Sequence, residues 1–282
     1  MARIAIIGGG NIGEALLAGL LRSGRQVKDI VVSERVPSRA RHLSETYAVR
    51  VANIADAVEN ADFVVIAVKP ADVESVITEI GDAVGRAESD TVDHVFVSVV
   101  AGVTTDFYES KLPAGAVVYR VMPNSPILVG AGISAIAKGR FTTPEVLTEV
   151  AALFESVGEV LTVPESQLDA VTAVSGSGPA YFFLMAEAMV DAGVAAGLSR
   201  AVATDLVAQT MLGSAVMLVE RTRDPERGTP IDTTPTELRA TVTSPAGTTA
   251  AGVAALERGG MRTAVADAVE AARIRAGELG IT

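Results

Sequence analysis

The hydrophobic pattern divides the chain into two parts with different periodicities. Up to about Pro164, short β-branched and apolar runs alternate with helical stretches such as 12–22 and 71–80. This alternation predicts βαβ units and therefore a parallel sheet. Runs without polar alternation, such as FVVIAV, fit strands that helices cover on both faces. The expected strands are 3–7, 29–33, 63–68, 94–100 and 116–121, and the segments 131–137 and 157–163 extend the same sheet.

After Pro164 the strand pattern disappears and long helical patterns follow, at 179–197, 199–220 and 259–279. The stretch 179–197 is apolar nearly all round, and a helix of this kind needs burial on every side. The second part of the chain offers few places to bury it, so we expect a partner subunit to cover it. A central helix in a monomeric bundle is the alternative. The polar, Pro- and Thr-rich stretch 221–236 is typical of a loop between helices.

A glycine motif follows the first expected strand directly and opens a helix. Gly8, Gly10 and Gly13 stand in G-x-G-x-x-G spacing, with Asn11 and Ile12 between the last two. Gly8 allows a tight turn, Gly10 lets a pyrophosphate approach the backbone, and Gly13 lets helix and strand pack closely. The free amides of the helix N-terminus then face the anion. We therefore predict an α/β fold, with a dinucleotide-binding Rossmann domain at 1–164 and an all-helical dimerisation domain at 165–282.

Three further strand ends should complete the dinucleotide site, because ligands of open α/β sheets lie beyond the carboxyl ends of the strands. In the stretch SER, Glu34 can bind a ribose 2′-hydroxyl, whereas Arg35 and the nearby Arg39 can pair with a 2′-phosphate or stack on adenine. These signals conflict, so NADH and NADPH both remain open as the cofactor. The residues expected at the three strand ends are Ser33, Glu34, Arg35, Ala67, Val68, Lys69, Pro70, Ala101 and Gly102.

Composition narrows the possible partners. Hydrophobic residues make up 49% of the chain and charged residues 20%, which suits a folded soluble protein. The net charge is −11 and neither half is basic, so nucleic acid is an unexpected partner. No stretch reaches the length of a membrane span without charged or turn residues, and the N-terminus enters a glycine loop instead of a cleavage site. We expect a cytoplasmic protein with no membrane partner and no metal site; cysteine is absent.

The order and spacing of six motifs resemble those of the pyrroline-5-carboxylate reductases, which carry out the last step of proline biosynthesis. The motifs are the glycine loop, AVKP (67–70), SVVAGV (98–103), RVMPNSP (120–126), SGSGPAY (175–181) and VTSPAGTT (242–249). The resemblance runs from residue 3 to about 279. It implies a Rossmann domain, and a helical domain that interlocks with a second subunit and places the substrate site at that interface, facing the nicotinamide. A higher ring of dimers is also compatible with it.

The resemblance also implies a substrate site in the SPAGTT stretch. Ser244, Gly247, Thr248 and Thr249 would hold the cyclic imino acid, and Thr249 would be the catalytic residue that hydrogen-bonds the ring nitrogen. The family usually has Gly-Gly where this chain has Ala246-Gly247. An acidic residue from the 221–236 loop, such as Asp232, is a further candidate. A turn that only caps a helix is the structural alternative, since Ser-Pro and Gly-Thr-Thr also end and begin helices.

The scarcity of acid–base side chains agrees with reduction of an imine. The only histidines are His42 and His94, and the last lysine is Lys138. Reducing a ketone requires a proton donor for the developing alkoxide, whereas a cyclic imine can arrive already protonated. A β-hydroxyacid dehydrogenase, the nearest alternative enzyme, would need a lysine in the helical domain. A non-catalytic dinucleotide-binding sensor would have no need for the polar turn at 244–249.

Overall fold

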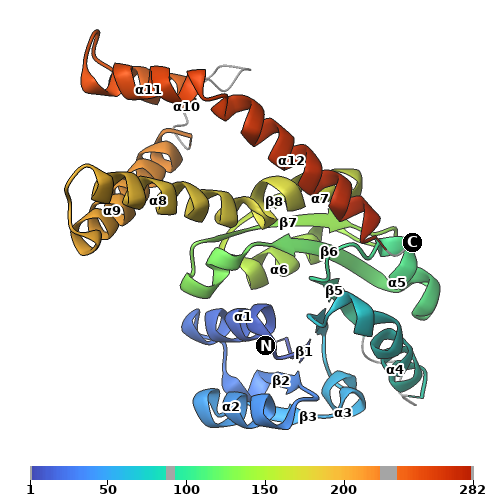
Figure 1. The fold of residues 1–282 in the computed structure, drawn as a ribbon. Coiled ribbons are helices and arrows are strands. Elements are labelled where there is room, and N and C mark those ends of the chain that lie inside the picture. The colour runs from blue at the N-terminus through green and yellow to red at the C-terminus, as the bar shows by residue number, and fades with distance from the viewer. Residues whose placement is uncertain (1, 87–92, 223–233, 281–282) are drawn as a thin grey trace. The chain divides into compact units, whose positions relative to one another are not determined.

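The computed structural model describes residues 2–86, 93–222 and 234–280. These form two compact units: unit 1 comprises 1–179 with 269–282, and unit 2 comprises 180–268. The division into these units does not coincide with the domain boundary predicted between residues 164 and 165. That domain boundary remains a prediction. Unit 1 holds the whole sheet, and the described regular elements of unit 2 are all helices (Figure 1).

Eight strands form one sheet in the order β3-β2-β1-β4-β5-β6-β7-β8. The order reverses at β1, so the chain winds outward from the middle of the sheet in both directions, as in a doubly wound fold. The strands are β1 (Ile4–Ile7), β2 (Ile30–Ser33), β3 (Arg50–Ala52), β4 (Phe63–Ile66), β5 (Val95–Ser98), β6 (Val117–Pro123), β7 (Gly132–Lys138) and β8 (Gly158–Thr162).

The predicted strands are all present, with two differences. All neighbouring strands are parallel except β6 and β7, which are antiparallel. The connection between them holds only the short helix η3 (Ser125–Val129), and a parallel pair would need a longer crossover. Strand β3 was not predicted. It is only three residues long, lies at the edge of the sheet and begins with the exposed Arg50, so its hydrophobic signal is weak.

Helices cover both faces of the sheet in unit 1. One core joins alternate residues of β1 and β2 to α1 (Asn11–Arg22), α2 (Pro37–Tyr47) and α6 (Pro144–Glu155). The other core joins the opposite faces of β1 and β4 to α3 (Ile54–Val58), α4 (Val73–Arg86) and α5 (Thr105–Lys111). All four residues of β1 and of β4 are buried, as their uninterrupted apolar sequences predicted.

Short elements complete unit 1 and lead into the long helices. They are η1 (Val27–Asp29), η2 (Pro70–Asp72), η4 (Glu165–Gln167), α7 (Leu168–Val171) and the π-helix η5 (Thr172–Gly176). The remaining helices are α8 (Gly178–Ala195), α9 (Arg200–Thr222), α10 (Thr234–Thr241), α11 (Thr248–Arg258) and α12 (Met261–Glu278).

The long predicted helices are confirmed, and helices also include both ends of the stretch 221–236 that was expected to be a loop. Helix α9 continues to Thr222 and α10 begins at Thr234, and the stretch between them, with Asp232, lies outside the described residues. By length and composition, helix α9 could also cross a membrane, and 11% of its most apolar 18-residue stretch is buried. The sequence did not indicate this because Asp205 interrupts the apolar run. One such helix is a weak indication of a span.

Candidate functional site

The carboxyl ends of the central strands lie side by side in unit 1. The Gly8 N–H donates to the carbonyl of Ser33 at 2.8 Å, and the Ala67 N–H donates to the carbonyl of Ile7 at 2.8 Å. The Val99 N–H donates to the carbonyl of the last residue of β4 at 3.0 Å. These bonds extend the sheet beyond β2, β1, β4 and β5, so the turns predicted to bind the dinucleotide follow neighbouring strand ends.

The glycine loop has the backbone geometry that its sequence predicts. Gly8 has a φ of +107°, and a Cβ there would lie 2.6 Å from the carbonyl oxygen of Ala67. A Cβ on Gly13 would overlap the carbonyl oxygen of Gly8, so this glycine lets α1 pack closely on the loop. A Cβ on Gly10 would meet nothing within 4 Å. Gly10 precedes α1, and among the described residues no side chain caps that helix. Its first amides are therefore available to an anion.

A cavity of about 810 Å³ lies against this loop. The predicted residues that line it are Gly8, Gly10, Ser33, Glu34, Arg35, Ala67, Val68 and Lys69. Residues predicted for the site but outside this lining are Asn11, Ile12, Gly13, Pro70, Ala101 and Gly102. The lining also contains residues that the sequence analysis did not assign to the site: Ile7, Val36, Ser38, His42, Ile54, Asp72, Ser75, Val76 and Glu79. Most of these lie on α2, η2 or α4, whose sequences carry no motif.

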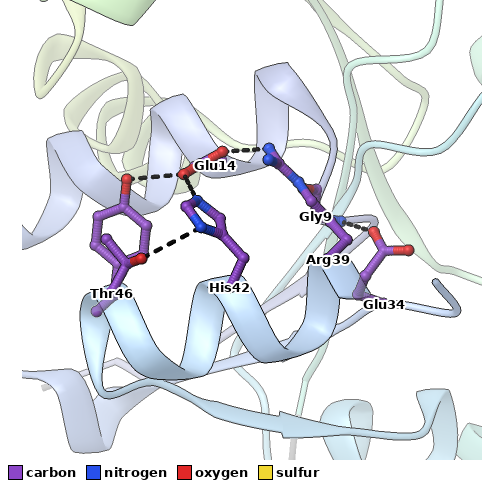
Figure 2. Close-up of polar contacts among 7 residues, drawn as sticks. Gly9, Glu14, Glu34, Arg39, His42 and Thr46 are labelled. Carbon is purple, nitrogen blue, oxygen red and sulfur yellow. Dashed lines mark hydrogen bonds and ion pairs between the residues drawn. The ribbon is translucent and has the colours of Figure 1, made fainter. Parts of the chain in front are cut away.

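Glu34 and Arg39 both bond the backbone of Gly9, in the middle of the glycine loop (Figure 2). The Glu34 carboxylate accepts a hydrogen bond from the Gly9 N–H at 2.8 Å and a second from the Val36 N–H at 2.7 Å. The Arg39 Nε donates to the Gly9 carbonyl at 2.7 Å. The side chain of Glu34 is therefore held in one orientation, with its carboxylate beside the loop. A hydroxyl could still donate to its remaining lone pairs.

Glu14, in the first turn of α1, gathers three side chains of α2 around its carboxylate (Figure 2). Arg39 forms an ion pair with it, the His42 Nε2 lies 2.9 Å away, and the Tyr47 hydroxyl donates at 3.0 Å. Burial alone would raise the pKa of Glu14, but the hydrogen bonds from His42 and Tyr47 and the charge of Arg39 hold it below its ordinary value. Glu14 therefore stays ionised and joins α1 to α2 next to the cavity.

Arg35 is engaged in a bidentate ion pair across the cavity lining. Its Nη1 and Nη2 donate to the two carboxylate oxygens of Asp72, at 2.8 and 2.9 Å. Asp72 ends η2, which begins at Pro70, the last residue of the predicted AVKP turn. Within that turn Lys69 has a φ of −72° and a ψ of 149°, the extended conformation that the following proline predicted. The pair therefore links the turn after β2 to the turn after β4.

The turn after β5 approaches the C-terminal end of α12, which also belongs to unit 1. Gly102 has a φ of +77°, and a Cβ there would lie 2.8 Å from the carbonyl oxygen of Leu279. A side chain at this position would be strained by the backbone conformation and blocked by that carbonyl. This gives Gly102 a structural reason to be glycine. The binding roles of Ala101 and Gly102 remain predictions.

In unit 2, the SPAGTT stretch forms a tight turn followed by a helix. The Gly247 N–H donates to the Ser244 carbonyl at 3.0 Å, and Ala246 has a φ of +57°. Pro245 and Ala246 occupy the two middle positions, an arrangement typical of a type II turn. Gly247 then precedes α11, whose first two residues are the exposed Thr248 and Thr249. The turn does begin a helix, and the same geometry presents exposed hydroxyls and first-turn amides to a small anion.

The described residues contain no group of three or more His, Asp or Glu side chains placed to hold a metal ion. Three acidic side chains at the cavity are paired with cations or amides: Glu14 with Arg39, Asp72 with Arg35, and Glu34 with backbone N–H groups. Glu79 is a further carboxylate of the lining. The cavity is thus suited to a ligand with hydroxyl and phosphate groups that approaches a helix N-terminus.

Comparisons with known proteins agree with this division of the chain. The family described as "NADP oxidoreductase coenzyme F420-dependent" matches residues 3–102, which contain the glycine loop and the cavity. The family described as "Pyrroline-5-carboxylate reductase dimerisation" matches residues 165–279, which contain the SPAGTT turn and the long helices.

Relatives and solved structures cover the chain from end to end. A pyrroline-5-carboxylate reductase of Mycobacterium tuberculosis is 64% identical, over 100% of this chain and 98% of the relative. One of Corynebacterium melassecola is 42% identical, over 99% of both. The structure of a pyrroline-5-carboxylate reductase from Coxiella burnetii has a TM-score of 0.88 at 33% identity and covers 100% of this chain and 99% of its own.

A Plasmodium falciparum pyrroline carboxylate reductase with NADP bound has a TM-score of 0.81 at 26% identity, over 99% and 98% of the two chains. With a cavity at the glycine loop in one part, a dimerisation match in the other and similar relatives over the full length, this chain belongs to the pyrroline-5-carboxylate reductase family.

Proposed function

We propose that this chain reduces 1-pyrroline-5-carboxylate to L-proline by hydride transfer from NADH or NADPH. The observation that carries the proposal is the 64% identity to a pyrroline-5-carboxylate reductase over the whole chain. The cavity at the glycine loop supports the cofactor part, because its residues fit a dinucleotide. Gly10 leaves open space where a side chain would stand, and the uncapped N-terminus of α1 has amides available to an anion.

The cofactor-binding roles follow from this placement. The amides of Gly10, Asn11, Ile12 and Gly13 would bind the pyrophosphate. Ser33, Glu34 and Arg35 would surround the adenine ribose, since they line the cavity beyond β2. The turns after β4 and β5 would border the nicotinamide, through Ala67, Val68, Lys69, Pro70, Ala101 and Gly102. The bound cofactor would supply the hydride.

The Ser244–Thr249 turn would hold the substrate. Ser244, Gly247 and the first amides of α11 would bind the carboxylate, with Thr248 beside them. Thr249 would hydrogen-bond the ring nitrogen and so orient the carbon that receives the hydride. A cyclic imine carries its proton near neutral pH and is then electrophilic before the enzyme acts. The task left to the protein is mainly positioning, which hydroxyls and backbone amides can accomplish without His, Cys or Lys.

The helical part would form a homodimer, and dimers could assemble further into a ring. The match to a dimerisation family supports the first step, and so do the exposed apolar side chains of α8. We propose that the protein works in the cytoplasm without a membrane, nucleic acid or metal partner. Asp205 lies within the apolar length of α9, which fits a helix covered by protein better than one in lipid.

Steady-state kinetics test the proposal directly. NADH or NADPH should be oxidised only when 1-pyrroline-5-carboxylate is added, and L-proline should form in equal amount. An open-chain 2-keto acid or a 3-hydroxy acid with the matching cofactor serves as the control substrate. Comparable turnover of either control would overturn the proposal, and cofactor binding without any turnover would favour the sensor alternative.

A further inference from the structure

We propose that Asp72 is a cofactor-specificity residue, which weakens binding of a 2′-phosphate by holding Arg35 in an internal ion pair. The inference rests on the proposed use of NADH or NADPH. Asp72 carries no motif of its own in the sequence. It is identified by its bidentate contact with Arg35 and by its place in the lining of the dinucleotide cavity.

The geometry of the ion pair determines which guanidinium nitrogens of Arg35 remain available to a ligand. Both terminal nitrogens of the guanidinium face the two oxygens of Asp72, at 2.8 and 2.9 Å. A phosphate is bound most strongly through two guanidinium nitrogens at once, and Asp72 already occupies the edge formed by Nη1 and Nη2. A 2′-phosphate must therefore displace Asp72 from Arg35 or accept the remaining edge of the guanidinium.

The second arginine in the cavity lining is restrained in the same way. Arg39 is paired with Glu14 and donates through Nε to the Gly9 carbonyl at 2.7 Å. It is partly enclosed, with 30% of its side chain exposed. Arg39 is therefore held by the glycine loop and by α1. Arg35, with 74% of its side chain exposed, is the arginine that can reorient toward a ligand.

The acidic groups of the lining act in the same direction. Glu34 and Asp72 both contribute carboxylates, and Glu34 is fixed beside the loop by the Gly9 and Val36 amides. A phosphate monoester carries between one and two negative charges near neutral pH, so both carboxylates repel it. A 2′-hydroxyl can instead donate to Glu34. The lining thus favours the cofactor without the 2′-phosphate. Among the lining residues, Asp72 is the one whose substitution should shift this preference most toward the cofactor with the 2′-phosphate.

The direct test uses two ligands that differ only in the 2′-phosphate, adenosine 5′-monophosphate and adenosine 2′,5′-bisphosphate. Titration calorimetry on the full-length protein gives a dissociation constant for each without nicotinamide or imine. Asp72→Asn should lower the dissociation constant for the bisphosphate by about tenfold and leave that for the monophosphate within about twofold. The NADPH to NADH ratio of kcat/KM should rise in parallel, through KM and not kcat.

Two controls separate release of Arg35 from loss of a negative charge. Glu79→Gln removes another carboxylate of the lining, one that makes no ion pair with Arg35, and it should give a much smaller change. In the double variant Arg35→Ala/Asp72→Asn the tenfold gain should disappear. An unchanged or higher dissociation constant for the bisphosphate in Asp72→Asn would overturn the inference, because Asp72 would then be presenting Arg35 to the phosphate. Failure of the proposed reaction would leave these binding results unaffected.

Discussion

In unit 1 helices cover both faces of the sheet, whereas in unit 2 most large apolar side chains lie at the surface of the single chain. Every residue of β1, β4 and β5 is buried. On α8, by contrast, three successive residues, Phe182, Phe183 and Leu184, are 65%, 68% and 67% exposed. Successive helical residues point about 100° apart, so these three side chains span more than half of the helix circumference.

The difference shows where each part obtains its stability. Burying a large apolar side chain is worth about 1.5–3 kcal/mol, and unit 1 gains this within its own two cores. The buried apolar cluster of unit 2 contains only Val190, Ala203 and Val207, with Ala186 and Met211 packed against it. We therefore expect unit 1 to tolerate isolation of the subunit and unit 2 to depend on association, as the match to a dimerisation family indicates.

The largest expected effect comes from a charge placed on the exposed apolar face of α8. Phe183→Glu would bury a carboxylate in the subunit interface, at a cost of several kcal/mol. The dimer dissociation constant should rise at least about a hundredfold, and activity should fall with the fraction of dimer. Sedimentation analysis combined with activity assays over a dilution series measures both.

The matched control lies in unit 1. Phe141 is also exposed, at 45%, and Phe141→Glu should leave the dimer and the activity unchanged. If both variants behave alike, the exposed face of α8 is not the interface. A Phe183→Glu variant that stays dimeric at nanomolar concentration would contradict the comparison between the units.

The second effect concerns the exposed turn in unit 2. Thr249→Val removes a hydroxyl and nearly preserves volume. A hydrogen bond to a charged group is worth about 1.5–3 kcal/mol, so kcat/KM for the imine should fall by roughly one to two orders of magnitude. The dissociation constants of NADH and NADPH should stay constant, because the glycine loop lies in unit 1. Thr248→Val should cost less. Near-wild-type kcat/KM for Thr249→Val would leave the turn with a structural role only.

The sequence predicted the regular elements better than the contacts between them. The helix expected at 12–22 is α1 at Asn11–Arg22, and the one at 199–220 is α9 at Arg200–Thr222, because apolar periodicity reports local structure directly. The antiparallel pairing of β7 was missed, although the short connection after β6 contained that information. The alternation of strands and helices does not report strand direction, which depends on the length of the connection.

The candidate site was predictable where backbone geometry requires a residue type, and less so where side chains pair at long range. Gly8 and Gly13 are needed for a turn and a close approach, and the motif spacing encodes both. The contact between Arg35 and Asp72 joins residues 37 positions apart, and that of Glu34 with Gly9 joins residues 25 apart. Nothing in local sequence specifies such partners. Arg35, predicted to pair with a 2′-phosphate or to stack on adenine, forms such a long-range ion pair with Asp72.

The third effect compares a partly buried carboxylate in unit 1 with an exposed one in unit 2. Glu14→Gln keeps the shape of the side chain but removes the charge that Arg39, His42 and Tyr47 surround. Unfolding at neutral pH should become easier by about 1–2 kcal/mol. Glu257, with 41% of its side chain exposed and paired with Arg262, is the control, and Glu257→Gln should change stability less.

The pH dependence of this effect has a definite sign. The folded-state pKa of Glu14 lies below 4.5, so its contribution is fully present above pH 4.5 and is lost as pH falls through the lowered pKa. Denaturant unfolding of the wild type and of Glu14→Gln should therefore converge as the solution is acidified below pH 4.5. A gap that stays constant through this range would mean that the charge of Glu14 is not the source of the stabilisation.

The smallest effect uses the two left-handed alanines, one in each unit. Ala48 ends α2 with a φ of 55°, and Ala246 lies in the substrate turn with a φ of 57°. A non-glycine residue in this conformation costs about 1–2 kcal/mol, and glycine recovers part of that while it gains freedom in the unfolded chain. Ala48→Gly and Ala246→Gly should each raise stability by about 0.5 kcal/mol, which is roughly 1–2 °C in Tm at a fixed protein concentration.

Only the variant in unit 2 should also change catalysis. A glycine at 246 gives the free turn more conformations, so binding the imine must order it, and KM should rise by roughly twofold. Ala48→Gly should leave KM unchanged, because Ala48 belongs to unit 1 and the Ser244–Thr249 turn belongs to unit 2. A lower Tm for Ala246→Gly would show that the left-handed conformation is not strained there. An equal rise in KM for both variants would show that the effect comes from general loosening and not from the turn itself.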